Sequence, residues 1–64
     1  MTKYIACATR RNIDNKPDYT WTEKYTNGLP VLFDTEADAL YTAERACYCV
    51  GHALYNPRAE IYQQ

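Results

Sequence analysis

The sequence predicts a small α+β fold, a two-layer sandwich in which one helix packs on one face of an antiparallel sheet of three or four strands. Three observations support this prediction. Residues 3–10 and 19–26 divide into two faces with the period of a strand. Residues 35–50 repeat their apolar positions with the period of a helix, and a last alternating segment follows at residues 58–62. The expected element order is therefore β-β-(β)-α-β.

The 64 residues are enough for one domain, residues 1–64, and so short a chain buries only about 60% of its unfolded surface. The three cysteines, Cys7, Cys47 and Cys49, are an odd number at spacings that do not predict a disulfide framework. No apolar run has the length of a signal peptide or a membrane span. We therefore expect a cytoplasmic protein with no membrane association, whose thin core favours a partner subunit.

Turn-forming residues between positions 11 and 18 predict a long loop that joins the first two strands as an antiparallel hairpin. Asn27 and Gly28 predict a tight turn, because both residue types accept positive φ. Residues 29–33 are expected to form either a further short strand or an extended lead-in to the helix. Pro30 would confine such a strand to a sheet edge.

In the helix, Asp34 or Thr35 is expected to cap the N-terminus. A stripe of mostly small apolar residues at positions 39, 40, 43, 46, 47 and 50 is expected to face the sheet. The helix should end near Val50 or continue to Tyr55. It cannot continue further, because the residue before Pro57 avoids the helical conformation.

A pair of tyrosines, Tyr41 and Tyr48, lies seven residues apart on a side of the helix about 100° or more from this stripe. The rings could simply lie along the helix flank with their hydroxyls in water. Several neighbouring aromatics can also form a contact patch. We predict a surface for a protein partner, either a larger protein or a second copy of the chain in a homodimer. Its residues are Tyr41, Tyr48, Arg45 and Glu44.

A second aromatic group, Tyr19, Trp21 and Tyr25, shares one face of the second strand. Strand register decides whether that face lies under the helix or on the open side of the sheet. The small residues of the helix need bulky partners, which favours Trp21 in the core. In the last strand, Ala59 and Ile61 are expected to point inward.

On the open side, the same aromatics would form a stacking platform for single-stranded nucleic acid, which is the alternative function. Its residues would be Trp21, Tyr19, Tyr25, Lys24, Arg10 and Arg11. The charge is nearly balanced, with seven Lys and Arg against eight Asp and Glu, and nucleic acid is therefore the less favoured partner.

A metal site and a catalytic site are not predicted. On a helix, Cys47 and Cys49 point about 200° apart and cannot close on one ion, even with His52 and Cys7 available. We expect Cys7 and Cys47 to be buried and Cys49 to be a free thiol. No set of residues supplies a nucleophile, a base and an orienting group together. The sequence therefore predicts no catalytic residue, no cofactor and no enzyme activity.

The segment at residues 32–40, LFDTEADAL, is an extended run that enters a capped helix. With the strand-strand-helix-strand order, it resembles the layout of short orphan proteins encoded by phages and prophages. The order is also similar to that of a small phage inhibitor of bacterial RNA polymerase. The resemblance covers organisation and carries over no functional residue. It implies a small accessory protein that acts by binding.

Overall fold

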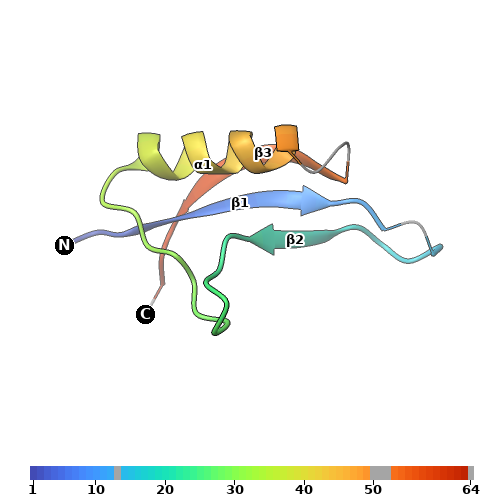
Figure 1. The fold of residues 1–64 in the computed structure, drawn as a ribbon, viewed down its shortest axis with the longest axis horizontal. Coiled ribbons are helices and arrows are strands. Elements are labelled where there is room, and N and C mark those ends of the chain that lie inside the picture. The colour runs from blue at the N-terminus through green and yellow to red at the C-terminus, as the bar shows by residue number, and fades with distance from the viewer. Residues whose placement is uncertain (13, 50–52, 64) are drawn as a thin grey trace.

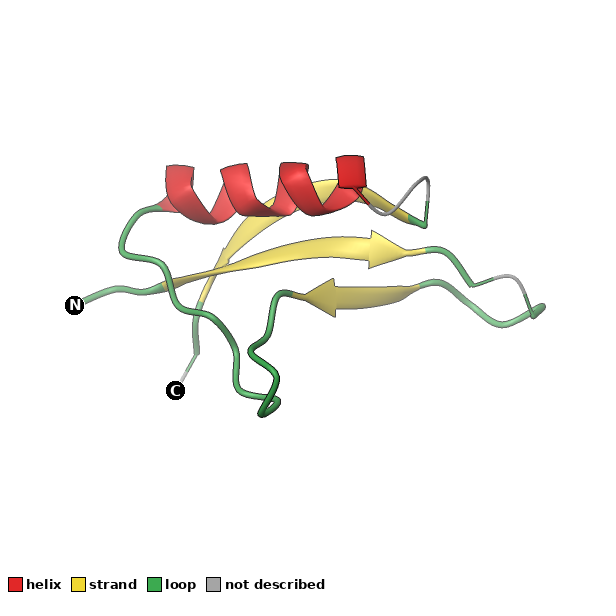
Figure 2. Cartoon of the chain, in the orientation of Figure 1, coloured by secondary structure: helices red, strands yellow, loops and turns green. Residues whose placement is uncertain are grey.

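The computed structural model describes residues 1–12, 14–49 and 53–63. The elements are β1 (Tyr4–Arg10), β2 (Tyr19–Thr22), α1 (Glu36–Cys49) and β3 (Leu54–Ile61) (Figure 1). The three strands form an antiparallel sheet in the order β2-β1-β3, and the helix packs on β1 and β3 (Figure 2). The predicted α+β class, with one helix on one face of the sheet, is confirmed.

The core lies between α1 and the sheet and is built from small side chains. Ala6 and Ala8 of β1, and Ala39 and Ala43 of α1, have no accessible surface. Because these side chains are single methyl groups, the helix backbone lies close to the sheet, as the small-residue stripe predicts. Leu54, at the start of β3, is the largest buried aliphatic side chain among the described residues.

Register assigns the two faces of the sheet. Ala8 lies opposite Trp21, and Ala6 lies opposite Ala59. Directly opposed residues point to the same face, so Trp21 and Ala59 share the helix side with the buried alanines. Trp21 is half-buried there rather than central, because β2 is an edge strand and the helix lies over β1 and β3. Trp21 therefore lies on the predicted face of the sheet, but it is not part of the buried core as predicted.

Strand β3 is longer than predicted, because it begins at Leu54 instead of Arg58. Tyr55 therefore belongs to a strand, and the expectation that the helix continues to Tyr55 is wrong. The other expected end, Val50, lies outside the described residues, and α1 is assigned to Cys49. Ile61 lies opposite Tyr4 and so points to the helix side as expected, but it is 57% exposed because the end of β3 diverges from the helix (Figure 1).

A β-bulge explains how β3 includes a proline. The pairing with β1 shifts between residues 7 and 9, which face residues 58 and 55, so β3 carries one extra residue there. Asn56 adopts a positive φ of 56° within this segment. Pro57 has no backbone N–H to donate, and an edge strand with a bulge accepts such a residue.

Strand β2 is shorter than predicted and ends at Thr22 instead of continuing to residue 26. Residues 29–33 belong to none of the three strands and form the expected extended lead-in to the helix. Within this lead-in, Phe33 and Tyr4 exchange two backbone hydrogen bonds, of 2.8 and 2.9 Å. These bonds fix the lead-in beside the start of β1.

The turn at Asn27 and Gly28 occurs where it is predicted, but only Gly28 takes a positive φ, of 88°. The Gly28 N–H donates to the carbonyl oxygen of Tyr25 at 3.0 Å. Asn27 contributes its side chain instead, because its Oδ1 accepts the Leu29 N–H at 3.0 Å. A turn followed by glycine in the left-handed region is a common hairpin connection.

Thr35 is the N-cap of α1, because its Oγ1 accepts the Asp38 N–H at 3.1 Å. Asp34, the other predicted cap, forms an ion pair with Lys3, and this partner lowers the pKa of the Asp34 carboxyl group. Within the part of the chain that the structure describes, no helix has both the length and the apolar character needed to cross a bilayer.

Candidate functional site

The face of α1 that points away from the sheet carries the four side chains predicted to bind a protein. Tyr41, Glu44, Arg45 and Tyr48 are spaced three or four residues apart and line a shallow depression of about 360 Å³. Tyr41 is 62% exposed and Tyr48 is 89% exposed. We call these four residues the outer helix surface.

The docking of the helix explains why both phenol rings are exposed. Ala39 and Ala43 are buried against the sheet, and this fixes the rotation of α1 about its axis. At 100° per residue, positions 41 and 48 both lie well away from that stripe. The phenol rings therefore project from the docked helix instead of packing beneath it.

Charge lies in the middle of the outer helix surface, and aromatic rings lie at its two ends. Glu44 and Arg45 are adjacent in the sequence and separate Tyr41 from Tyr48. The Arg45 guanidinium carbon is 5.8 Å from the centroid of the Tyr41 ring, within the range of a cation–π contact. The surface thus offers two apolar rings, one cation and one carboxylate to a partner.

The cysteines are free thiols at three levels of burial. Cys7 is buried, Cys47 is half-buried and Cys49 is exposed. Burial, with a smaller contribution from the Glu44 carboxylate, raises the pKa of Cys47. Within the described residues, no three His, Cys, Asp or Glu side chains lie close enough together to hold a metal ion. His52 lies outside those residues.

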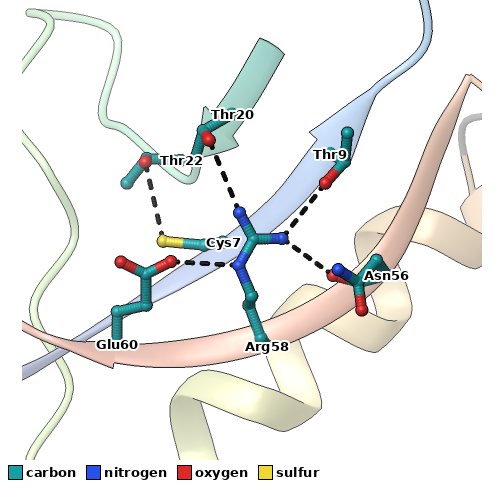
Figure 3. A network of polar contacts seen from close by, with 7 residues as sticks. All are labelled: Cys7, Thr9, Thr20, Thr22, Asn56, Arg58 and Glu60. Atoms are coloured by element: carbon teal, nitrogen blue, oxygen red, sulfur yellow. Dashed lines mark hydrogen bonds and ion pairs between the residues drawn. The ribbon is translucent and has the colours of Figure 1, made fainter. Parts of the chain in front are cut away.

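A network of polar contacts covers the sheet face opposite the helix (Figure 3). Its centre is the Arg58 guanidinium, which donates from Nε to Glu60 Oε2 at 3.0 Å. Its Nη1 donates to Thr9 Oγ1 at 3.2 Å and to the Asn56 carbonyl oxygen at 3.0 Å. Its Nη2 donates to Thr20 Oγ1 at 3.5 Å. One side chain therefore links all three strands.

The Cys7 thiol lies within this polar face and is 1% exposed. Its Sγ is 3.7 Å from Thr22 Oγ1. Burial is the main cause that raises the pKa of Cys7. The expected burial of Cys7 is confirmed, but its surroundings are polar. Sequence reasoning did not find the Arg58 network, although the polar alternation of residues 20–22 and 58–60 is the signal for it.

The residues of the alternative nucleic-acid surface do not share one face. Because β2 ends at Thr22, the predicted alignment of three aromatics extends only over Tyr19 and Trp21, and Tyr25 lies beyond the strand. The open face, where a stacking platform was expected, carries the threonines and Arg58 instead. Of the cationic members, Arg10 and Lys24 are exposed, and the Arg11 guanidinium lies 5.2 Å from the Tyr55 ring centroid.

The chain matches no protein-family model, no curated protein and no solved structure. Its own geometry defines it as an α+β sandwich with two different faces. One face is an aromatic and charged helix surface, and the other is a polar sheet face whose groups bind one another.

Proposed function

We propose that this chain is a small accessory protein that acts by binding another protein through the outer helix surface. The observation that supports this most is the exposure of Tyr41 and Tyr48 on either side of Glu44 and Arg45. A phenol ring offers a large, rigid and amphipathic contact area at a low cost in conformational entropy. Tyrosine and arginine are also enriched among the residues that dominate binding energy at interfaces.

The proposal favours binding over catalysis because the groups with shifted pKa values have structural roles. The Asp18 carboxyl pKa is lowered mainly by the hydrogen bond from Tyr55, and the Asp34 carboxyl pKa is lowered by Lys3. The Cys7 thiol pKa is raised mainly by burial. Contacts and burial within the fold cause these three shifts, and none of the three groups belongs to the outer helix surface.

The size of the molecule fits this role. An interface of standard size buries about 800 Å² on each partner, which is about a sixth of the 4866 Å² surface of this chain. A single helix face covers the central part of such an interface. A larger protein and a second copy of the chain are the two kinds of partner that this proposal includes.

The test compares two sets of tyrosine substitutions. The double variant Tyr41→Ser, Tyr48→Ser removes both rings of the outer helix surface, whereas Tyr25→Ser removes an exposed ring from the turn after β2. Each immobilised variant is incubated with an extract of the source cells, and self-association is measured in parallel by sedimentation. The double variant should lose retained proteins or self-association that Tyr25→Ser keeps. Equal behaviour of the two variants, or no association of the unsubstituted chain, contradicts the proposal.

A further inference from the structure

We infer that the helix-side face of β2 binds single-stranded nucleic acid, with bases stacked on Tyr19 and Trp21 and a phosphate held by Arg10. We call these three residues the β2 platform. It is a different surface from the outer helix surface, so the inference goes beyond the proposed function. The ligand is a single strand of DNA or RNA, because its unpaired bases have faces that are free to stack on aromatic rings.

Strand register brings the three side chains of the β2 platform together. Arg10 lies directly opposite Tyr19, and Ala8 lies directly opposite Trp21. Residues that oppose each other point to the same face, and so do residues two apart on one strand. Tyr19 and Trp21 are therefore neighbours on the side of the sheet that carries α1, about 6.8 Å apart along the strand. Two successive bases can each stack on a separate ring.

The helix leaves the β2 platform uncovered. The helix α1 packs on β1 and β3, and β2 is the strand farthest from it (Figure 2). Tyr19 is consequently 51% exposed, and Trp21 is half-buried. The partial burial of the indole restricts its rotation, so less conformational entropy is lost when a base stacks on it.

Charge complementarity favours a nucleic acid as the occupant. Arg10 is exposed and forms no ion pair with any residue that the structure describes. Asp18 precedes Tyr19 in the sequence, but its two carboxylate oxygens accept hydrogen bonds from the Tyr55 hydroxyl group and the Asn12 N–H. A guanidinium group binds phosphate oxygens through charge-assisted hydrogen bonds. An apolar peptide would leave this cation without a partner, whereas each nucleotide brings a phosphate together with a base.

A carboxylate limits the β2 platform at the end away from Arg10. The backbone N–H of Glu23 donates to the carbonyl oxygen of Ala6 at 3.0 Å, so Glu23 lies opposite Ala6 and continues the helix-side face. Its carboxylate repels a phosphate. The β2 platform therefore holds about two bases, and we expect a Kd between about 10 µM and 1 mM at low ionic strength.

The fluorescence of Trp21 tests the inference at the site itself, because Trp21 is the only tryptophan of the chain. A base that stacks on the indole quenches this fluorescence. The unsubstituted chain is titrated with oligothymidylate and oligouridylate of about 12 nucleotides, and with a GC-rich DNA duplex of the same length. Quenching by either single strand supports the inference, and the strand that binds more tightly shows whether the 2′-hydroxyl group contributes. The duplex should bind at least about tenfold more weakly, because its bases are already stacked on one another.

Two matched pairs of variants locate the site, and all four keep Trp21. Tyr19→Ser removes an exposed ring from the β2 platform, and Tyr48→Ser removes one from the outer helix surface. Arg10→Gln and Arg45→Gln each remove one exposed guanidinium from the same two surfaces. Tyr19→Ser should raise the Kd about tenfold, and Arg10→Gln should reduce the slope of log K against log salt by about 0.7. The two variants of the outer helix surface should bind as the unsubstituted chain does.

Four results would overturn the inference. They are unchanged fluorescence up to about 1 mM oligonucleotide, equal affinity for duplex and single strand, a salt slope that Arg10→Gln leaves unchanged, and a Tyr48→Ser variant that loses as much affinity as Tyr19→Ser. Circular dichroism of each variant confirms that the fold is intact before its binding is interpreted.

The inference and the proposed function fail separately. If oligonucleotides do not bind, yet Tyr41→Ser, Tyr48→Ser loses a captured protein, the inference fails and the proposed function stands. If oligonucleotides bind at the β2 platform, yet that double variant behaves as Tyr25→Ser does, the proposed function fails and the inference stands. If no oligonucleotide binds and Tyr19→Ser loses a captured protein, the helix-side face of β2 is a protein surface and the inference fails.

Discussion

The hydroxyl group of Tyr55, on β3, donates a hydrogen bond to the carboxylate of Asp18, which lies 37 residues earlier in the chain. The other carboxylate oxygen of Asp18 accepts the Asn12 N–H at 2.9 Å, and the Arg11 guanidinium lies over the Tyr55 ring. These contacts attach the long loop between β1 and β2 to the first residues of β3. The contact between Tyr55 and Asp18 therefore couples two segments that no local sequence pattern connects.

This contact predicts a pH window for part of the stability. The Tyr55 hydrogen bond, followed by the Asn12 N–H, lowers the pKa of Asp18 from its ordinary value of 3.8. A carboxyl group with a lowered pKa stabilises the fold at pH values above its ordinary pKa. This stabilisation is lost as the pH falls through the folded-state pKa. The same bond raises the pKa of Tyr55 above its ordinary value of 10.0. The stabilisation from the Tyr55 hydroxyl group is present at pH values below its ordinary pKa and is lost as the pH rises through the raised pKa.

Tyr55→Phe should therefore lower the Tm near pH 7, and the difference in Tm from the unsubstituted chain should narrow as the pH falls below 3.8 and as it rises above 10.0. Thermal unfolding followed by circular dichroism measures it. As a control, Asp18→Asn should return the pKa of Tyr55 toward its ordinary value, which NMR titration of that ring reports. A Tm difference that is the same at every pH would show that the ring, and not the charged hydrogen bond, carries the effect.

The Arg58 network predicts that arginine cannot be replaced by lysine. Arg58→Lys keeps the charge, but one ammonium group cannot reach Thr9, Thr20 and Glu60 with the forked geometry of a guanidinium. Losing two or three hydrogen bonds should lower the free energy of unfolding by about 1–3 kcal/mol. Urea denaturation measures this change.

Arg45→Lys, on the outer helix surface, is the matched control for Arg58→Lys and should change the free energy of unfolding by less than about 0.5 kcal/mol. Equal effects at the two positions would show that the polar face of the sheet contributes no more to stability than an exposed side chain does.

Much of the helix could be predicted from the sequence because its signals are local. The spacing of Ala39 and Ala43 sets the docked side, and Thr35 caps the N-terminus without help from the sheet. The extent of β3 could not be predicted in the same way. Pro57 indicates only where a helix must stop, and the bulge that admits it depends on pairing with β1, about 50 residues away in the chain.

The two faces of the molecule also differ in whether local sequence signals or strand pairing determine them. The exposure of Tyr41 and Tyr48 follows from helical geometry once the docked stripe is known, so the sequence is enough to predict their position. The Arg58 network needs the register of three strands before Thr9 and Thr20 become its neighbours. A one-residue change in register would move those threonines to the other face.

The burial of the thiols predicts an order of chemical modification. Cys49 is exposed and should react first with an aromatic disulfide reagent, followed by the half-buried Cys47. Cys7 should react last, because it is 1% exposed and burial raises its pKa, which lowers the thiolate fraction. Mass spectrometry of peptides from timed samples gives the three rates.

Arg58→Ala should accelerate the reaction of Cys7 by about tenfold or more, because the guanidinium lies beside that thiol on the open face and its loss makes local opening easier. Easier opening should outweigh the loss of a cation that lowers the pKa of the thiol. The rate at Cys49 serves as the internal control and should stay the same. A uniform acceleration of all three cysteines would indicate global destabilisation instead of local exposure of Cys7.

The close approach of α1 to the sheet predicts that enlarging an alanine is costly at one helix position and neutral at another. Ala43 has no accessible surface, so Ala43→Leu must displace the helix or strain the core and should lower the free energy of unfolding by about 1–3 kcal/mol. Ala37 is exposed on the same helix. Ala37→Leu should change the free energy of unfolding by less than about 0.5 kcal/mol, because leucine and alanine have similar helix propensities. Urea denaturation of the two variants compares the same chemical change on the docked side and the exposed side. If Ala43→Leu were as well tolerated as Ala37→Leu, the alanine side would not be docked, and the rotation of α1 that exposes Tyr41 and Tyr48 would lose its physical cause.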